Sequence, residues 1–241
     1  MAEREVTITT VDGSCDAYFV APTAGAAPGV LIWPDVFGLR PAFRQMGRRL
    51  AESGYSVLVV NPFYRQKKAP TAAQGGQTAI AEVMPLMQAL TPAMHLSDAK
   101  AFVAWLDAQK EVDKARKLGT TGYCMGGPIA VRTATVAPDR VGAVGTFHGA
   151  AMVNGSPDSP HRLLAQTKAR YLIAVAENDD AKEPETKTTL RTAFESAKLS
   201  AEVEVYPAAH GWCPPDSRVY DAAQAERAWT RLLATFNQAL A

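Results

Sequence analysis

The sequence predicts an α/β protein with a mostly parallel sheet and helices on both of its faces. Short, continuous apolar runs such as residues 29–33 and 55–60 are typical of strands buried on both sides. Segments with helical spacing separate these runs along the chain, as in βαβ units. The length of 241 residues, with 47% hydrophobic and 20% charged residues, suits one large domain with a substantial core. We therefore expect residues 1–241 to form a single domain.

Turn and cap signals set the element boundaries. Asp12-Gly13 is a hairpin signal between two terminal segments, which predicts an antiparallel pair. Ser53-Gly54 ends the first helical pattern. The predicted strands are residues 6–10, 15–20, 29–33, 55–60, a short strand ending at residue 121, 141–147, 169–176 and 201–206. The predicted helices are residues 43–52, 94–109, 128–136, 183–197 and 216–240.

Residues 65–90 interrupt this alternation. The segment contains Lys67-Lys68-Ala69-Pro70, then Gly75-Gly76, then a helix with Met84 and Met87. A periodic pattern resumes directly afterwards, which favours an insertion over a linker. We interpret the segment as a cap-like insertion over one face of the domain.

Composition excludes several classes of protein. The net charge is +1 and no basic stripe is present, so we expect no nucleic-acid partner. No apolar run approaches 18 residues and no signal-like segment is visible, so we expect no membrane partner. Cys15, Cys124 and Cys213 are odd in number and irregularly spaced, which argues against a disulfide framework and fits a reducing cytoplasm.

The most informative motif is Gly122-Tyr123-Cys124-Met125-Gly126-Gly127, between a predicted strand and a predicted helix. A G-x-C-x-G run in this context places one side chain at the apex of a strained turn, with glycines where a Cβ would crowd the close approach. The backbone N–H of Met125 would then stabilise an oxyanion. A buried structural cysteine beside a glycine-rich turn is the alternative interpretation.

Two later strand ends supply partners for Cys124 in the order nucleophile, acid, base. The strand at 169–176 leads into Glu177-Asn178-Asp179-Asp180, and the strand at 201–206 leads to His210. His210 would favour the thiolate, and Asp179 would orient the imidazole. Asp180 competes with Asp179 for this role, and Glu177 ranks third. A loop histidine and an ordinary turn carboxylate are the alternatives.

The other histidines carry less information. His148 follows the strand at 141–147, and lining a pocket and plain packing are equally good interpretations of it. His95 and His161 are expected to be solvated. His210 and Cys213 have zinc-like local spacing, but no second ligand pair accompanies them, so we expect no metal and no other cofactor.

A family resemblance extends from Pro28 to the C-terminal helix. The residues that carry it are Trp33-Pro34-Asp35-Val36-Phe37-Gly38, Gly54-Tyr55-Ser56-Val57, Asn61-Pro62-Phe63-Tyr64, the motif around Cys124, Ala176-Glu177-Asn178-Asp179 and His210-Gly211-Trp212. Together they resemble the dienelactone hydrolase family of α/β-hydrolases. The resemblance implies the α/β-hydrolase fold, Cys124 as nucleophile with Asp179 and His210, and an oxyanion hole formed by the N–H groups of Met125 and Val36.

The chain also departs from the family pattern. Asp35 stands where the best-known members have a glutamate that helps to ionise the thiol, so the shorter side chain is at most an auxiliary group. Pro214 stands where an arginine binds the substrate carboxylate. Arg65 and Arg218 are alternatives for that task, although both are more typical of surface residues. Pro184 lies one residue late relative to Asp179, which keeps Asp180 open as the acid.

We expect a carboxylic-ester or lactone hydrolase that forms an acyl-thioester at Cys124 and acts on a small molecule. The predicted pocket residues are Phe37, Tyr64, His148 and Trp212, with Trp33, Met84 and Met87 beside them. The alternative is a hydrolase-fold protein that binds a small ligand or partner with little turnover. Either protein would be a monomer or a homodimer.

Overall fold

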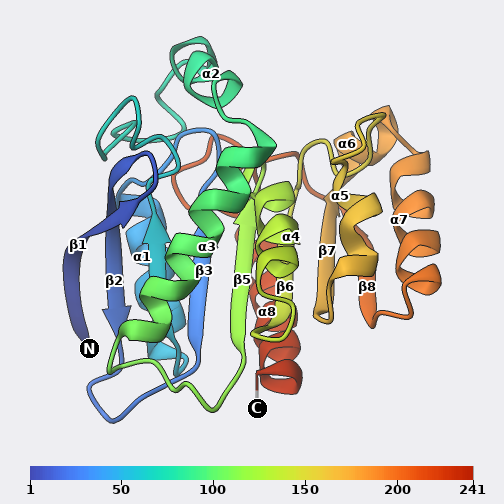
Figure 1. Cartoon of the computed structure of the whole chain (residues 1–241). Coiled ribbons are helices and arrows are strands. Elements are labelled where there is room, and N and C mark those ends of the chain that lie inside the picture. The colour runs from blue at the N-terminus through green and yellow to red at the C-terminus, as the bar shows by residue number, and fades with distance from the viewer. Residues whose placement is uncertain (241) are drawn as a thin grey trace.

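A central sheet of eight strands organises the molecule in the computed structural model, which describes residues 1–240 (Figure 1). The strands are β1 (Ala2–Thr10), β2 (Gly13–Ala21), β3 (Gly29–Trp33), β4 (Ser56–Val60), β5 (Leu118–Tyr123), β6 (Val141–Phe147), β7 (Arg170–Ala176) and β8 (Ala201–Tyr206). Their spatial order is β1-β2-β4-β3-β5-β6-β7-β8. The hairpin β1–β2 is antiparallel and joins β4 in antiparallel fashion, while the strands from β4 to β8 are parallel.

Helices cover both faces of the sheet, which confirms the predicted α/β class. α1 (Pro41–Glu52) and α8 (Ala222–Ala239) pack on one face through a core that includes Phe43 and Phe236. α3 (Pro92–Ala108), α4 (Gly126–Val136) and α7 (Glu185–Ser196) pack on the other face, with Phe102, Ile129 and Phe194 in the core. In Figure 1 the second group lies in front of the sheet and the first group behind it. β3 and β4 are fully buried between these layers, as their apolar sequences require.

Two predicted helices have different bounds in the structure. The segment 183–197 was expected to be one helix after an acidic turn, but the acidic residues themselves form α6 (Glu177–Lys182) and α7 begins at Glu185. The last helix begins at Ala222, not at residue 216, because the side chain of Asp221 accepts a hydrogen bond from the N–H of Gln224 and caps it there.

The segment 65–90 and its helix α2 (Ile80–Gln88) lie at the carboxyl ends of the parallel strands, at the top of Figure 1. Two short elements, α5 (Pro160–Leu163) and η1 (Leu164–Gln166), connect β6 to β7. None of the helices within residues 1–240 combines the length and the apolar character needed to cross a membrane.

Candidate active site

Cys124 occupies a strained turn between β5 and α4. Its φ of 53° lies in the left-handed region, which is unfavourable for a residue with a side chain. A Cβ on Gly122 would lie 2.0 Å from the carbonyl oxygen of Gly126, and one on Gly126 would lie 2.3 Å from the carbonyl oxygen of Trp33. The Cys124 carbonyl oxygen accepts hydrogen bonds from Gly127 and from Ala150, each at 3.1 Å. The two glycines therefore permit the turn, and the neighbouring loop holds its apex.

His210 connects Cys124 to Asp179. His210 Nδ1 lies 2.5 Å from Asp179 Oδ2, and the backbone N–H of His210 donates to Asn178 Oδ1 at 2.7 Å. Cys124 and His210 line the same cavity. Burial opposes the imidazolium charge, but the hydrogen bond with Asp179 and the proximity of Cys124 outweigh it and raise the pKa of His210 to about 10. The loops after β7 and β8 thus bring all three side chains together.

The competing acids point elsewhere. Both carboxylate oxygens of Asp180 accept hydrogen bonds from Lys187 Nζ, at 2.6 and 2.7 Å. Glu177 is exposed, and its backbone N–H donates to the carbonyl of Ala208. The geometry therefore favours Asp179 as the partner of His210.

The two predicted oxyanion donors come from separate segments, one next to Cys124 in sequence and one in the turn after β3. Met125 follows Cys124 directly, and Val36 lies in the turn after β3, whose end approaches Gly126. Within residues 1–240 neither backbone N–H donates a hydrogen bond to another protein group. Both donors are thus free to bind a substrate oxygen.

Asp35 is engaged by other groups. Its Oδ1 accepts hydrogen bonds from Arg40 Nη1 at 2.6 Å and from the N–H of Phe37 at 2.9 Å, and its Oδ2 accepts one from Arg40 Nη2 at 3.0 Å. Arg40 was not singled out from the sequence, because its second partner, Asp216, is 176 residues away. The Asp35 carboxylate is therefore bonded to Arg40 and Phe37, and makes no hydrogen bond with the Cys124 thiol.

A cavity of about 310 Å³ opens over Cys124 and His210. The turn after β3 lines one wall, the segment 75–80 a second and the loop 210–218 a third. The lining residues are Asp35, Val36, Phe37, Arg40, Gly75, Gly76, Thr78, Ala79, Ile80, Cys124, His148, His210, Gly211, Ser217 and Arg218. The insertion therefore forms part of the wall, and of the two arginines considered, Arg218 reaches the cavity.

Two of the four predicted pocket residues, Phe37 and His148, line this cavity, whereas Tyr64 and Trp212 do not. The Tyr64 hydroxyl donates to Asp98 Oδ1 at 2.8 Å, on the far side of the insertion. Trp212 is buried and stacks on Tyr206, with ring centroids 5.3 Å apart. Trp33, Met84 and Met87 are also absent from the lining. The sequence shows that these aromatic and Met side chains are apolar, but it does not show whether each one faces the cavity or the core.

His148 packs beside His210. It is buried at a φ of 42°, and its ring centroid lies 5.0 Å from those of His210 and Trp212. Burial, with a contribution from His210, holds the pKa of His148 well below its ordinary value, so the ring is neutral. His148 therefore both lines the cavity and packs against His210.

His95 is half-buried with both ring nitrogens inaccessible, which corrects the expectation that it is solvated. Burial lowers its pKa to about 3. The periodicity of a helix start could not show that α4 packs against α3.

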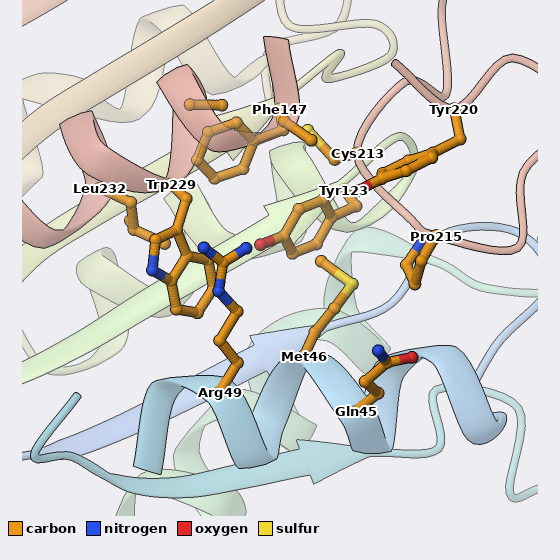
Figure 2. Close-up of a pocket in the computed structure, with 12 residues that line it drawn as sticks. Gln45, Met46, Arg49, Tyr123, Phe147, Cys213, Pro215, Tyr220, Trp229 and Leu232 are labelled. Atoms are coloured by element: carbon orange, nitrogen blue, oxygen red, sulfur yellow. The ribbon is translucent and has the colours of Figure 1, made fainter. Parts of the chain in front are cut away.

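A smaller cavity, of about 90 Å³, lies beside Tyr123 at the end of β5, between α1 and α8 (Figure 2). Tyr123, Phe147 and Cys213 line it, together with Arg49 and Trp229. Neither Cys124 nor His210 does, so this cavity is separate from the candidate site. Within residues 1–240 no cluster of three or more His, Cys, Asp or Glu side chains could hold a metal ion.

The strand order, the strained turn and the acid and histidine at later strand ends define the class of protein as an α/β-hydrolase. The sequence profile of the dienelactone hydrolase family matches residues 15–240. The chain belongs to this family, and is accordingly an enzyme of the carboxylic ester hydrolase class.

Individual relatives are similar over most of their length. A protein of Methylorubrum extorquens named "Putative carboxymethylenebutenolidase" is 30% identical, over 97% of this chain and 80% of its own. A protein of Salmonella typhi with the same name is 29% identical, over 96% of this chain and 86% of its own. A crystal structure from Klebsiella pneumoniae titled "Putative Dienelactone Hydrolase" has a TM-score of 0.86 and 26% identity, and 98% of each chain is covered.

Proposed function

We propose that the chain hydrolyses a carboxylic ester or lactone through an acyl-thioester on Cys124. The observation that carries this proposal is the position of His210, which lines the same cavity as Cys124 and lies 2.5 Å from Asp179 through its Nδ1. A pKa of about 10 keeps the imidazole protonated at neutral pH. An imidazolium stabilises a thiolate and can protonate a leaving group.

The reaction has two halves. The Cys124 thiolate attacks the carbonyl carbon, and the N–H groups of Val36 and Met125 stabilise the oxyanion. The C–O bond breaks, the leaving oxygen takes the proton of His210, and the acyl group remains on sulfur. Neutral His210 then removes a proton from water, which attacks the thioester, and the acid leaves as the thiolate and imidazolium return. Asp179 orients the ring in both halves.

The cavity favours a small, partly apolar acyl group. Val36, Phe37, Ala79 and Ile80 supply apolar wall, while Thr78, Ser217 and Arg218 supply polar groups near the rim. With Cys15, Cys124 and Cys213 all free, we place the reaction in a reducing compartment such as the cytoplasm.

The test is replacement of Cys124 with alanine, assayed with p-nitrophenyl acetate and with a panel of lactones and longer esters. We expect Cys124→Ala to abolish turnover, while the matched variant Cys213→Ala, outside the cavity, stays active. Circular dichroism checks that both variants are folded. Unchanged turnover in Cys124→Ala would reject the thioester route.

A protein that binds a small ligand with little turnover is the second candidate. It is favoured by the engagement of Asp35 with Arg40, which leaves the thiol without the acidic helper expected for the family. Iodoacetamide labelling followed by peptide mass spectrometry separates the two candidates. Rapid labelling of Cys124 relative to Cys15 and Cys213 supports the hydrolase, and equal slow labelling of all three supports the binder.

A further inference from the structure

Arg40 links three segments of the chain around the cavity. We propose that it is a positioning residue, which holds both the oxyanion-hole turn and the 74–80 segment of the insertion over Cys124. The catalytic part of this proposal rests on the proposed function, while the part that concerns the insertion does not.

The Arg40 side chain is fully buried and lies between two carboxylates. One end of the guanidinium donates to Asp35 at 2.6 and 3.0 Å. Nε and Nη2 donate to Asp216 at 2.7 and 2.9 Å, in a second bidentate pair. A planar guanidinium can satisfy two carboxylates at fixed angles, which an ammonium group cannot do.

The first carboxylate shapes the oxyanion-hole turn. Asp35 accepts from the N–H of Phe37 through its side chain at 2.9 Å, and from the N–H of Gly38 through its carbonyl at 2.9 Å. Such bonds define a tight Asx-type turn. Val36 lies inside this turn with its N–H unused. Because Arg40 fixes the Asp35 carboxylate, it also fixes the donor that faces the substrate oxygen.

The second carboxylate holds the insertion. Asp216 Oδ2 accepts from the N–H of Gly75 at 2.7 Å, and its backbone carbonyl accepts from the N–H of Gly76 at 2.8 Å. A Cβ on Gly75 would lie 2.7 Å from Arg40 Nη2, and one on Gly76 would lie 2.6 Å from the Asp216 carbonyl oxygen. The insertion is therefore seated directly on the ion pair.

Loss of Arg40 would leave two carboxylates near one another with no counter-charge, since Asp35 is buried and Asp216 is half-buried. One of them must take up a proton or move into water, because an uncompensated buried charge is strongly unfavourable. Either response loosens the turn at Val36 or the seat of the insertion. The thiol and His210 make no hydrogen bond with Arg40, and are expected to keep their reactivity.

The first experiment compares Arg40→Met with Arg44→Met, one turn further along α1, where Arg44 pairs at the surface with Glu5. We expect kcat for p-nitrophenyl acetate to fall about 10²-fold in Arg40→Met, as after loss of one oxyanion donor. The iodoacetamide labelling rate of Cys124 should stay within about twofold of wild type, since alkylation needs no oxyanion hole. Arg40→Lys should recover part of kcat, and Arg44→Met should match wild type in both measurements.

The second experiment removes no charge, and it tests the role of Arg40 even if Arg40→Met fails to fold. Gly75→Ala should displace the guanidinium, while Gly155→Ala, with nothing within 4 Å of the added Cβ, is its control. Amide hydrogen exchange of peptides covering residues 72–82 should accelerate at least tenfold in Gly75→Ala and not in Gly155→Ala. This measurement needs no substrate, so it stands even if the wild type hydrolyses no ester.

Three results would overturn the proposal. They are a kcat in Arg40→Met within twofold of wild type, a parallel loss of hydrolysis and Cys124 labelling, and unchanged exchange of residues 72–82 in Gly75→Ala. The second result would mean that Arg40 acts on the thiol. Absence of hydrolysis in the wild type, by contrast, would reject the proposed function. The role of Arg40 in holding the insertion would then be tested by the hydrogen exchange of residues 72–82 alone.

Discussion

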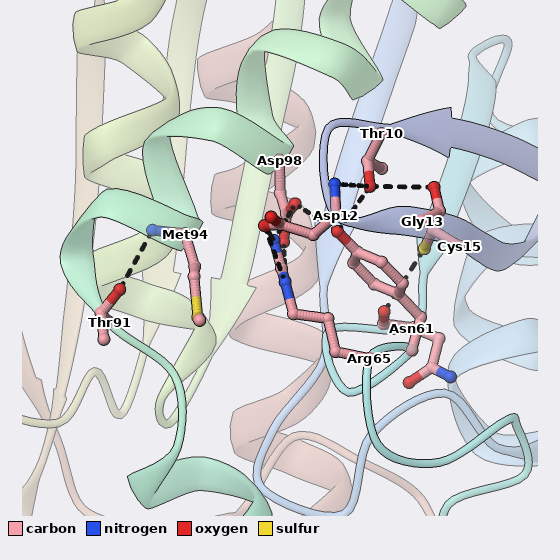
Figure 3. A network of polar contacts seen from close by, with 10 residues as sticks. Thr10, Asp12, Gly13, Cys15, Asn61, Arg65, Thr91, Met94 and Asp98 are labelled. Atoms are coloured by element: carbon pink, nitrogen blue, oxygen red, sulfur yellow. Dashed lines mark hydrogen bonds and ion pairs between the residues drawn. The ribbon is translucent and has the colours of Figure 1, made fainter.

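Two arginines in this chain each lie between two aspartates, in networks that differ in what they hold. Arg40 is fully buried between Asp35 and Asp216, and its network lines the cavity over Cys124. Arg65 is 13% exposed and bonds to Asp98 through two nitrogens, at 2.8 and 2.7 Å, and to Asp12 (Figure 3). None of the residues in the Arg65 network lines that cavity.

The Arg65 network joins three parts of the fold. Asp12 belongs to the β1–β2 turn, Asp98 to α3 and Arg65 to the start of the insertion, while Tyr64 bridges Asp98 to Thr10. The Arg40 network joins loops at the carboxyl ends of parallel strands, where the site of an α/β sheet forms. The Arg65 network therefore connects elements of the fold, whereas the Arg40 network, which borders the cavity, holds the geometry of the site.

Two adjacent aspartates also differ in whether they contact the site, and replacing the one that does should have the largest effect on kcat. Asp179 contacts His210, whereas Asp180 pairs with Lys187. We expect Asp179→Asn to lower kcat by up to about 10⁴-fold, because the imidazole loses its orienting carboxylate. Asp180→Asn should change kcat less than twofold. Steady-state assays of both variants with one ester measure this, and equal losses would show that α6 as a whole, not one carboxylate, supports the base.

Removal of Arg65 should separate stability from turnover. In Arg65→Met the buried Asp98 loses its counter-charge, and we expect the free energy of unfolding to fall by about 3–5 kcal/mol. The value of kcat measured below the unfolding transition should be unchanged. Urea titrations and kinetics on the same samples provide the check. A lower kcat with an unchanged free energy of unfolding would mean that Arg65 acts on the site, and the two arginines would then not differ in role.

The sequence predicted most of what depends on local pattern. Cys124, Asp179 and His210 could be proposed as site residues because parallel strands carry their carboxyl ends to one edge of the sheet, so that strand-end residues far apart in sequence meet. Met125 followed from the turn motif around Cys124 and Val36 from the family resemblance, and neither N–H group donates to another backbone group of the described residues. The sequence predicts an acidic turn at residues 177–180, whereas these residues form the first part of α6.

Long-range pairing and loop direction could not be predicted. Arg40 reads as one of several arginines around α1, and nothing near it in sequence points to Asp216. Tyr64 and Trp212 look like pocket aromatics, but a hydrogen bond with Asp98 and a stack on Tyr206 direct them elsewhere. The contributions of charged residues to the site therefore depend on tertiary contacts that a single sequence does not reveal.

His210 should contribute a pH-dependent stability through its contact with Asp179. The pKa of His210 is raised to about 10 in the folded chain, from an ordinary value of 6.5. Its stabilisation is therefore complete below pH 6.5 and is lost as the pH rises towards 10, because the unfolded chain releases the proton first. Urea unfolding at several pH values should show this decline in wild type and in Arg65→Met. The decline should be smaller in His210→Gln, and an identical slope in that variant would contradict the assignment.

The smallest effect is expected at the exposed end of the Arg65 network. The Asp12 side chain is 42% exposed, against 3% for Asp98. Exposed ion pairs are screened by water and salt, so Asp12→Asn should cost less than about 1 kcal/mol. Asp98→Asn should cost more, about 2–3 kcal/mol, since its bonds to Arg65 and Tyr64 are buried and charge-assisted. Urea titrations at low and high salt should change only the Asp12 value. Equal losses of stability at the two positions would mean that burial does not determine the strength of the ion pairs in this network. The comparison between Arg65 and Arg40 would then lose its basis.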